Sequence, residues 1–236
     1  MLVDKTMSRR TFLLGAVSTT AVLAGCVSQR DITPIVPPAP TKPPVQDGPY
    51  TVAELEAMYG PVEDNGYMIP AVPYQQIDPI YYRQRVIDPT GEAPGTVVVD
   101  TPNRFLYLVE PDGTAMRYGV GIGRAGFSWG GNGVIKWKQE WPKWFPPAEM
   151  IERDPKLKEY SEKNGGMPAG LMNPLGARAL YIFENGKDTL YRVHGNPDWT
   201  SIGKAVSSGC IRMINQDVID LYNRVDNLPT PIVVYQ

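Results

Sequence analysis

Short apolar runs separated by turn-forming residues fill the chain from Gly95 to its C-terminal end. Runs of roughly four to eight residues that are apolar, or that alternate with polar residues, are typical of β-strands when Gly, Pro, Asn or Asp bound them. We therefore expect strands at 96–100, 105–109, 114–120, 134–141, 179–183, 190–193 and 231–235. Pro111-Asp112-Gly113 is a strong turn signal, so the second and third of these strands should form a hairpin.

Two segments outside this pattern have the features of short helices. Val52, Leu55 and Met58 recur at helical spacing behind Thr51, which is a suitable N-cap, and Gly60-Pro61 should end this helix. A second short helix is expected within 148–160.

A third helix is expected after residue 214. Asn215 is its expected N-cap, and Asp217 in the first turn suits the helix dipole. The expected buried stripe consists of Val218, Ile219, Leu221, Tyr222 and Val225. Strands and helices do not alternate along the chain as they would in a parallel α/β fold. The pattern therefore predicts a mainly β fold with two or three short helices.

The first 26 residues have the features of an export signal. Ser8-Arg9-Arg10-Thr11-Phe12-Leu13 is typical of a twin-arginine signal, and the apolar run 12–23 is shorter than the ~20 residues of a membrane-spanning helix. Leu23-Ala24-Gly25-Cys26 resembles the bacterial lipobox, whose cysteine carries lipid. An uncleaved anchor or a plain secretory signal are the alternatives. We expect a domain on the periplasmic side of the cell envelope, held to a membrane by lipid on Cys26.

Residues 27–49 should form a tether between this signal and the domain. The segment contains Pro34, Pro37, Pro38, Pro40, Pro43, Pro44 and Pro49. Proline fixes φ and lacks an N–H group, so such a segment is extended and semi-rigid.

Composition and charge exclude several function classes. The 236 residues carry a formal net charge of −2, and charged side chains make up 20%. A nucleic-acid-binding domain would need a basic patch or stripe, so we expect no nucleic-acid partner. The GxGxxG match at Gly121–Gly126 is weak, because no helix follows it to receive a phosphate.

The rarest residues of the chain lie close together. His194 is the only histidine, and Cys210 is one of two cysteines. If Cys26 carries lipid, Cys210 has no disulfide partner within the chain. Zinc sites usually take three or four Cys, His or carboxylate ligands, so this pair favours neither a metal site nor another cofactor. Free cysteine is often a small buried hydrophobe, but the nearby histidine favours nucleophilic chemistry.

A cysteine nucleophile needs a base, a group that orients the base, and donors for an oxyanion. His194 is the only imidazole available as the base. Gly209 has no Cβ, so its N–H and that of Cys210 could approach a reacting carbonyl. The orienting group could be Asp198, Asp188 or a backbone carbonyl, and the sequence alone leaves these three open.

These residues carry a family resemblance. His194-Gly195 and Ser207-Ser208-Gly209-Cys210-Ile211-Arg212-Met213 resemble the signature of the L,D-transpeptidase catalytic domain, the YkuD family. The segments 95–126, 141–147 and 173–180 resemble family segments in the same order, so the resemblance covers residues 95–236. It implies a β-sandwich with the cysteine at the mouth of a groove. Residues 50–94 would then be an N-terminal extension that wraps the domain surface or covers this groove.

The resemblance also implies a reaction and roles for particular residues. Cys210 would attack the carbonyl of the third residue of a peptidoglycan tetrapeptide stem, a diamino acid, and D-alanine would leave. A second stem would then accept the acyl group, which gives a 3→3 crosslink. His194 would be the general acid/base, the carbonyl of Gly195 would orient its ring, and Gly209 would donate to the oxyanion. Carbapenem-type β-lactams would be inhibitors.

Four further residues are expected to bind substrate or hold the loop: Arg212, Ser207, Ser208 and Asn196. Many family members carry histidine where this chain has Ser208, and many carry threonine where it has Asn196. Water as acceptor would make the chain an L,D-carboxypeptidase, and a protein amine would make it an enzyme that fixes an envelope protein to the wall. A non-catalytic wall-binding module is disfavoured, because thiol, imidazole and glycine are all present.

Overall fold

The computed structural model describes residues 50–123, 129–207 and 209–236, without the side chain of Ser207. The expected export signal, Cys26, the proline-rich tether and Ser208 lie outside the described residues. Within these ranges no helix combines the length and the apolar character needed to cross a membrane.

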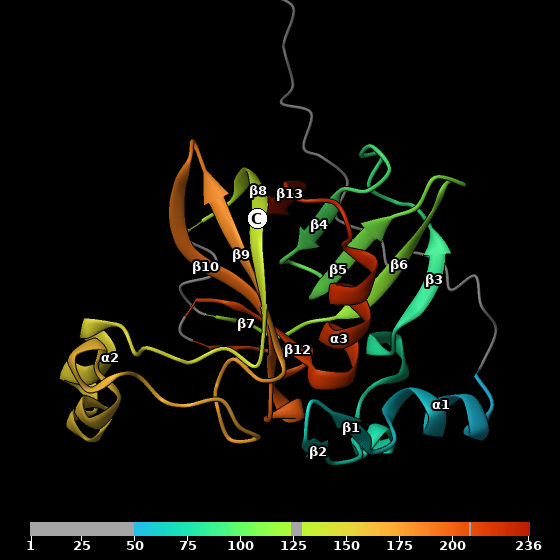
Figure 1. The fold of residues 1–236 in the computed structure, drawn as a ribbon. Coiled ribbons are helices and arrows are strands. Elements are labelled where there is room, and N and C mark those ends of the chain that lie inside the picture. The colour runs from blue at the N-terminus through green and yellow to red at the C-terminus, as the bar shows by residue number, and fades with distance from the viewer. Residues whose placement is uncertain (1–49, 124–128, 208) are drawn as a thin grey trace, which may run out of the picture. The chain divides into compact units, whose positions relative to one another are not determined.

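A nine-stranded mixed sheet dominates the described part of the chain (Figure 1). Its strand order is β12-β10-β9-β8-β13-β4-β5-β6-β3. The bounds are β3 Gln84–Ile87, β4 Val97–Asp100, β5 Phe105–Val109, β6 Thr114–Gly119, β8 Gly131–Glu140, β9 Arg178–Glu184, β10 Lys187–Asn196, β12 Ile211–Ile214 and β13 Thr230–Tyr235. Two smaller sheets pair β1 Val62–Asp64 with β2 Tyr67–Ile69, and β7 Ile122–Gly123 with β11 Ala205–Ser207.

The helices are few and short. The α-helices are α1 Val52–Tyr59, α2 Ala148–Arg153 and α3 Asn215–Arg224. The 3-10 turns are η1 Tyr74–Gln76, η2 Pro79–Tyr81, η4 Pro155–Tyr160, η5 Glu162–Asn164 and η6 Trp199–Ser201. The predicted mainly β fold with a few short helices is confirmed.

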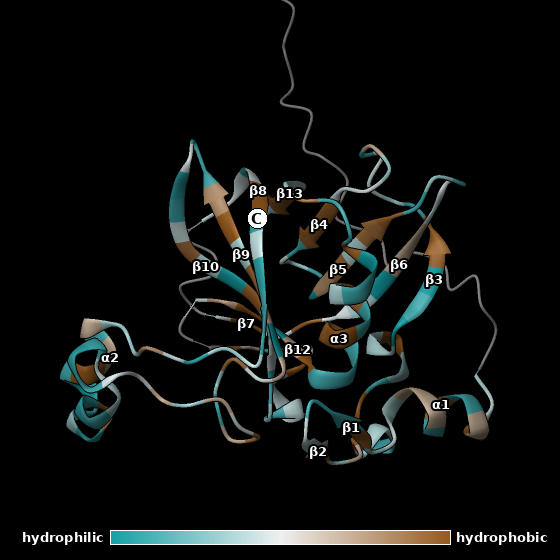
Figure 2. Cartoon of the chain, viewed as in Figure 1, coloured by the Kyte–Doolittle hydropathy of each residue, from teal (hydrophilic) through white to brown (hydrophobic). Residues whose placement is uncertain are grey.

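The apolar runs correctly predicted all seven strands that they marked. The hairpin around Pro111-Asp112-Gly113 is present, with β5 and β6 antiparallel. All five residues of β5 are buried, because both faces of this strand are covered. Leu106 and Leu108 belong to the main core, whereas Phe105 and Tyr107 pack in a second cluster on the other face. Figure 2 accordingly shows β4 and β5 as largely hydrophobic.

The sheet curls back on itself around one core. Side chains from β6 (Tyr118), β9 (Leu180) and β12 (Ile211) share the main hydrophobic cluster, although these strands are far apart in the sheet order. Gly121, just after β6, exchanges two backbone hydrogen bonds with Arg212 in β12, at 2.9 and 2.7 Å. Figure 1 shows α3 between the β9–β10 and β5–β6 parts of the sheet.

Two of the predicted helices are present where they were expected. Thr51 caps α1, as predicted, and does so through a capping box. Leu55 is buried, as its spacing suggests, but Val52 is 64% exposed and Tyr59 is the other buried residue. The short helix expected within 148–160 is present as α2, which ends at Arg153, and a 3-10 turn begins at Pro155. No residue of α2 is buried, and Figure 1 shows this helix away from the sheet.

The prediction of Asn215 as an N-cap is wrong. α3 begins at Asn215 with Ile214 in the cap position, and the Asn215 Oδ1 accepts a hydrogen bond from the Ala177 N–H at 2.9 Å. The amide is therefore used for a contact between α3 and the segment before β9. Asp217 lies in the first turn, as expected, and Val218 and Leu221 are fully buried.

Residues of the N-terminal extension supply parts of the core and of the sheet. β3 pairs with β6 at the sheet edge, with Val86 opposite Ala115. A separate hydrophobic cluster joins Leu55, Tyr59, Val72, Tyr74, Ile77 and Tyr82 of the extension with Ile202 and Ile214. Asp64 forms two hydrogen bonds with the buried Arg178, at 2.7 and 2.8 Å.

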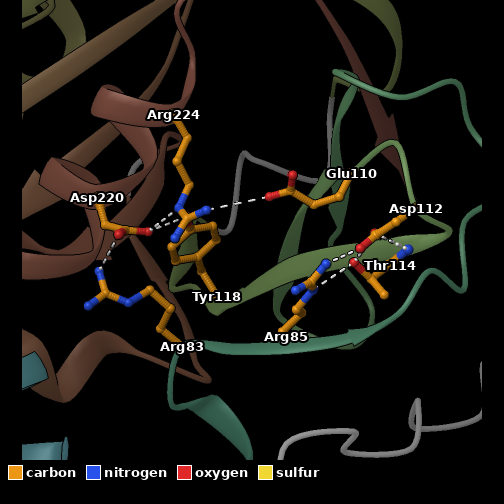
Figure 3. A network of polar contacts seen from close by, with 8 residues as sticks. All are labelled: Arg83, Arg85, Glu110, Asp112, Thr114, Tyr118, Asp220 and Arg224. Carbon is orange, nitrogen blue, oxygen red and sulfur yellow. Dashed lines mark hydrogen bonds and ion pairs between the residues drawn. The ribbon is translucent and has the colours of Figure 1, made fainter.

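Charged side chains join the extension to α3 (Figure 3). Arg83 lies 3.3 Å from Asp220 and 3.8 Å from Asp217. Asp220 also accepts hydrogen bonds from the Tyr118 hydroxyl at 2.7 Å and from Arg224 at 2.8 Å. This network connects the extension, β6 and α3, which begins directly after β12.

Candidate active site

His194 lies near the end of β10, between two neighbouring strands. It is paired with Ala179 on the antiparallel strand β9 and with Arg212 on the parallel strand β12. The side chain is buried, and its Nδ1 lies 2.6 Å from the carbonyl oxygen of Gly195. A carbonyl can only accept, so Nδ1 carries the proton in the neutral ring and Nε2 presents a lone pair.

Burial keeps this imidazole neutral. Loss of solvation lowers the pKa of His194 to about 4, against the opposing effect of the Gly195 carbonyl. The positive charges of Arg212 and Arg192 lower the pKa further. At neutral pH the ring is therefore a neutral base with a fixed tautomer.

The packing around Gly195 leaves no space for a side chain. A Cβ at this position would lie 2.3 Å from the Asn215 Oδ1 and 3.0 Å from a Val218 methyl group. A Cβ at Gly176 would also lie 2.3 Å from the Asn215 Oδ1, and Gly176 has a φ of +62°. Asn215 therefore fits between two glycines and fixes the backbone that holds His194. This function of Asn215 is not evident from the sequence, because its place before an apolar stripe matches that of an N-cap.

Cys210 lies in the bend that leads into β12, directly after Gly209, whose φ of +139° favours glycine. The residue is partly exposed, and its Sγ lies 4.0 Å from the carbonyl oxygen of Leu190. Burial of the sulfur raises the pKa of the thiol. A backbone N–H and the charge of Arg192 act in the opposite direction.

A bulge in β10 forms the surface against which the thiol lies. The pairing with β9 shifts between Asp188 and Arg192, and Leu190 has a φ of +64°. Asp188 accepts a hydrogen bond from the Leu190 N–H at 2.8 Å and binds the Arg192 guanidinium through both oxygens, at 2.6 and 2.7 Å. Nothing in the apolar run of β10 marked this bulge.

The two aspartates considered as orienting groups for His194 have other contacts. Asp188 holds the bulge, and Asp198 accepts hydrogen bonds from the N–H and the hydroxyl of Thr200, at 3.1 and 2.6 Å. Of the three candidate orienting groups, a backbone carbonyl lies beside the imidazole: the Gly195 oxygen is 2.6 Å from Nδ1. The Pro174 carbonyl also raises the pKa of His194.

Arg212 lies beside His194 in the ladder between β10 and β12. Its backbone bridges Gly121, and its Nε is buried without a hydrogen-bond partner among the described residues. Loss of solvation lowers the pKa of this guanidinium, and the charge of Asp198 raises it. Its positive charge also lowers the pKa of both His194 and Cys210.

The remaining predicted site residues hold the surrounding backbone. Asn196 is buried; its Nδ2 donates to the Pro174 carbonyl at 3.0 Å and its Oδ1 accepts from the Asp198 N–H at 2.8 Å. Ser207 lies opposite Gly123 in the ladder between β11 and β7. These contacts fit the expectation that Asn196 holds a loop.

The neutral imidazole of His194 thus lies on β10, opposite Arg212 of the parallel strand β12, and the thiol of Cys210, which follows a glycine, lies directly before β12. This set of groups suits acyl transfer through a thioester, in which the imidazole moves the proton.

Comparisons with known proteins identify the family. The family described as "YkuD: L,D-transpeptidase catalytic domain" matches residues 94–234. The probable L,D-transpeptidase ErfK/SrfK of Escherichia coli (strain K12) is 34% identical over 140 residues, which are 56% of this chain and 41% of that protein. The probable L,D-transpeptidase YbiS of the same strain is 32% identical over 150 residues, which are 60% of this chain and 45% of that protein.

The matched segment spans less than half the length of these curated relatives. A Brucella melitensis crystal structure, described as a probable carnitine operon oxidoreductase, is 48% identical, with 69% of this chain and 99% of that chain covered and a TM-score of 0.46. The family match extends over more than half of the chain and includes both His194 and Cys210. The chain therefore belongs to the L,D-transpeptidase catalytic-domain family.

Proposed function

We propose that this chain is a peptidoglycan L,D-transpeptidase that forms 3→3 crosslinks through a thioester on Cys210. The observation that carries the proposal is the contact of 2.6 Å between the His194 Nδ1 and the Gly195 carbonyl. This contact leaves Nε2 as a base on the strand that pairs with the one following Cys210. Family membership supports the choice of substrate.

In the first half-reaction the Cys210 thiol gives its proton to the His194 Nε2, and the sulfur attacks the carbonyl of the third stem residue. The N–H groups of Gly209 and Cys210 stabilise the oxyanion. The C–N bond to the terminal D-alanine then breaks, and its nitrogen takes the proton from the imidazolium. The products are a thioester and free D-alanine.

In the second half-reaction the side-chain amine of another stem attacks the thioester. The imidazole accepts the proton of the amine, the C–S bond breaks, and the sulfur recovers a proton from the imidazolium. The new amide joins two third residues, and no cofactor is needed at any step.

The protonation states support a general-base mechanism. The pKa of the Cys210 thiol is raised and that of His194 is lowered to about 4, so both groups are neutral before substrate binds. Transfer of the proton accompanies attack on the carbonyl rather than preceding it. A neutral thiol is also less exposed to oxidation than a thiolate outside the cytoplasm.

The expected place of action is the periplasmic side of the envelope, after twin-arginine export and lipidation of Cys26. Cys26→Ala should move the protein from the membrane fraction to the soluble periplasmic fraction, whereas Arg9→Lys with Arg10→Lys should keep it in the cytoplasm. Unchanged membrane association of the Cys26→Ala variant would contradict the lipid anchor.

The reaction is tested by incubating the protein with purified disaccharide-tetrapeptides and analysing the products by mass spectrometry. Dimers linked between two third residues, with release of D-alanine, are expected from the wild type, and neither product from Cys210→Ala. Tripeptide without dimers would indicate an L,D-carboxypeptidase. Attachment of an added envelope protein in place of dimers would indicate a protein amine as acceptor. Product formation by Cys210→Ala would reject the nucleophile.

A carbapenem provides a second readout that does not depend on the acceptor. It should acylate the wild-type protein, with the adduct on the peptide that contains Cys210, and should prevent dimer formation. The Cys210→Ala variant should carry no adduct.

A further inference from the structure

A cavity of about 420 Å³ lies between the N-terminal extension and the segment that precedes β11. The extension contributes residues 76–78 and Tyr81, and the other wall consists of residues 199–200 and 202–204. The volume lies in the range of small-molecule sites, roughly 300–1,000 Å³. The site described above uses none of these side chains.

Two half-buried aromatic residues, Trp199 and Tyr81, line this cavity. The Tyr81 ring is held by two close backbone approaches: a Cβ at Gly203 would lie 2.5 Å from the ring, and a Cβ at Gly119 would lie 2.5 Å from the Tyr81 Cβ. Trp199 packs against the hydrophobic cluster of the extension. The aromatic surface is therefore already in place before a ligand binds, which lowers the entropic cost of binding.

Polar side chains surround these rings. Gln76, Asp78, Thr200 and Lys204 are exposed at the cavity. The Gln76 amide and the Lys204 ammonium have no hydrogen-bond or ion-pair partner among the described residues. Aromatic faces with amide, hydroxyl and charged groups around them suit a ligand that has an apolar face and a rim of hydroxyl and acetamido groups. A pyranose ring has this character.

The backbone connects the cavity to the active site. Asp198 caps the turn that carries Trp199 and Thr200, and its charge raises the pKa of Arg212. Cys210 follows Lys204 by six positions, so their Cα atoms are at most about 22 Å apart. The wall of the cavity at residues 199–204 and Cys210 therefore belong to one short stretch of the chain, which favours a substrate that contacts both.

We propose that this cavity binds the N-acetylhexosamine glycan of peptidoglycan and holds the sugar while Cys210 acts on the attached stem. The proposal rests on the proposed function for the identity of the substrate. It also gives the extension a part in substrate binding, because Gln76, Asp78 and Tyr81 belong to it.

Binding is tested on the full chain with chitotetraose, a soluble N-acetylglucosamine oligomer. The indole N–H resonance of Trp199, assigned by its loss in Trp199→Phe, should shift on titration, whereas the free tetrapeptide stem should not move it. Gln76→Ala and Lys204→Ala change exposed groups and should weaken the response without unfolding the protein. A shift with the peptide but not with the sugar, or with neither, would overturn the proposal.

Measurements of kcat/KM on substrates with and without the sugar distinguish the glycan site from the proposed reaction. Trp199→Ala should lower kcat/KM for the disaccharide-tetrapeptide about tenfold, which corresponds to about 1.4 kcal/mol, and leave the free tetrapeptide unchanged. Trp199→Phe should retain most of the activity, and carbapenem acylation of Cys210 should be equal in all variants. An equal loss on both substrates would overturn the glycan site. If the wild type turns over neither substrate but the indole still shifts with chitotetraose, the proposed reaction fails and the sugar site stands.

Discussion

Burial is the main cause of the raised pKa of the Cys210 thiol, and Asp188, in the bulge of β10, adds to it. Its carboxylate raises the pKa of the thiol and is paired with Arg192, whose charge lowers it. Asp188→Asn should therefore lower the thiol pKa, because the opposing negative charge is lost and the Arg192 charge is no longer neutralised. The measurement is the pH dependence of Cys210 alkylation by iodoacetamide, whose midpoint should move to lower pH.

The exposed Asp226 provides a matched control for this substitution. Asp226→Asn should leave the alkylation midpoint where it is in the wild type. A midpoint that stays in place for Asp188→Asn, or moves upward, would show that the bulge does not set the thiol pKa.

Gly195 should tolerate no side chain, because the Asn215 amide and Val218 occupy the space of a Cβ. Gly195→Ala should lower the free energy of unfolding by about 1–3 kcal/mol, the usual cost of overpacking, and should reduce acylation of Cys210. Urea unfolding measures the first effect. Gly170→Ala is the control, because a Cβ at Gly170 meets nothing within 4 Å; similar losses in both variants would contradict the role of this packing.

At the scale of single residues, the sequence predicted which groups are present but not how they are oriented. His194 and Cys210 stood out because they are rare. Asp188 was one of three candidates to orient His194, but it binds Leu190 and Arg192 inside a bulge. The periodicity of a strand does not predict a bulge, so the sequence left these candidates open. Asn215 was misread because an N-cap and a buried amide between glycines have the same local sequence.

Among the elements, α3 carries a buried carboxyl group whose pKa is strongly raised. Asp217 has no solvent exposure, and burial raises its pKa to about 7 from 3.8. Arg83 lies 3.8 Å away and lowers the pKa, whereas Asp220 raises it, and the hydroxyl of the buried Tyr59 also faces this group. The folded state therefore holds a proton at Asp217 where the unfolded state does not.

This difference predicts a pH dependence of stability. Between about pH 4 and 7 the unfolded chain binds fewer protons at Asp217, so its contribution to the free energy of unfolding falls as pH rises, by up to about 1.4 kcal/mol per pH unit. His194 acts in the opposite direction between about pH 4 and 6.5, because its folded pKa is lowered. The two contributions offset each other in that range.

Asp217→Asn should remove the contribution of Asp217 to the pH dependence of stability and leave that of His194. The stability of this variant should rise with pH between about 4 and 6.5 more steeply than that of the wild type, as measured by urea unfolding across this range. Asp226→Asn again serves as the control. Parallel pH profiles for Asp217→Asn and the wild type would contradict the raised pKa of Asp217.

The strand elements were the best predicted from sequence, because each apolar run is bounded by clear turn signals. β5 and its hairpin with β6 agree with the prediction, since Pro111-Asp112-Gly113 fixes the turn. α1 was placed correctly but its buried face was not. Tyr59 rather than Val52 turns inward, because the aromatic cluster of Tyr74 and Tyr82 lies on that side.

For the whole molecule, residues 50–94 should be needed for the stability of the remainder. Arg178 is 4% exposed and is paired with Asp64, and Ile202 and Ile214 pack against the extension. A chain that begins at Gly95 would lose the pair of Arg178 with Asp64, and breaking a buried pair costs up to about 3–5 kcal/mol. It should unfold at a lower temperature than a chain that begins at Tyr50. Equal melting temperatures would show that the extension is dispensable for folding.

The contribution of the extension was beyond sequence analysis. Its segment has no clean period after Gly60, and its contacts with Arg178, Ile202 and Gln216 join residues that are far apart in the chain. The curling of the sheet depends likewise on the bridge between Gly121 and Arg212. Local patterns predict elements, whereas these long-range contacts decide how the elements meet.

A thioester on Cys210 can be trapped and identified directly. The protein is mixed with disaccharide-tetrapeptide, quenched in acid at early times, digested with pepsin and analysed by mass spectrometry. We expect a disaccharide-tripeptide acyl group on the peptide that contains Cys210, together with one released D-alanine per adduct. Crosslinked or trimmed product that forms while the Cys210 peptide stays unmodified, or an acyl group found on another residue, would contradict it.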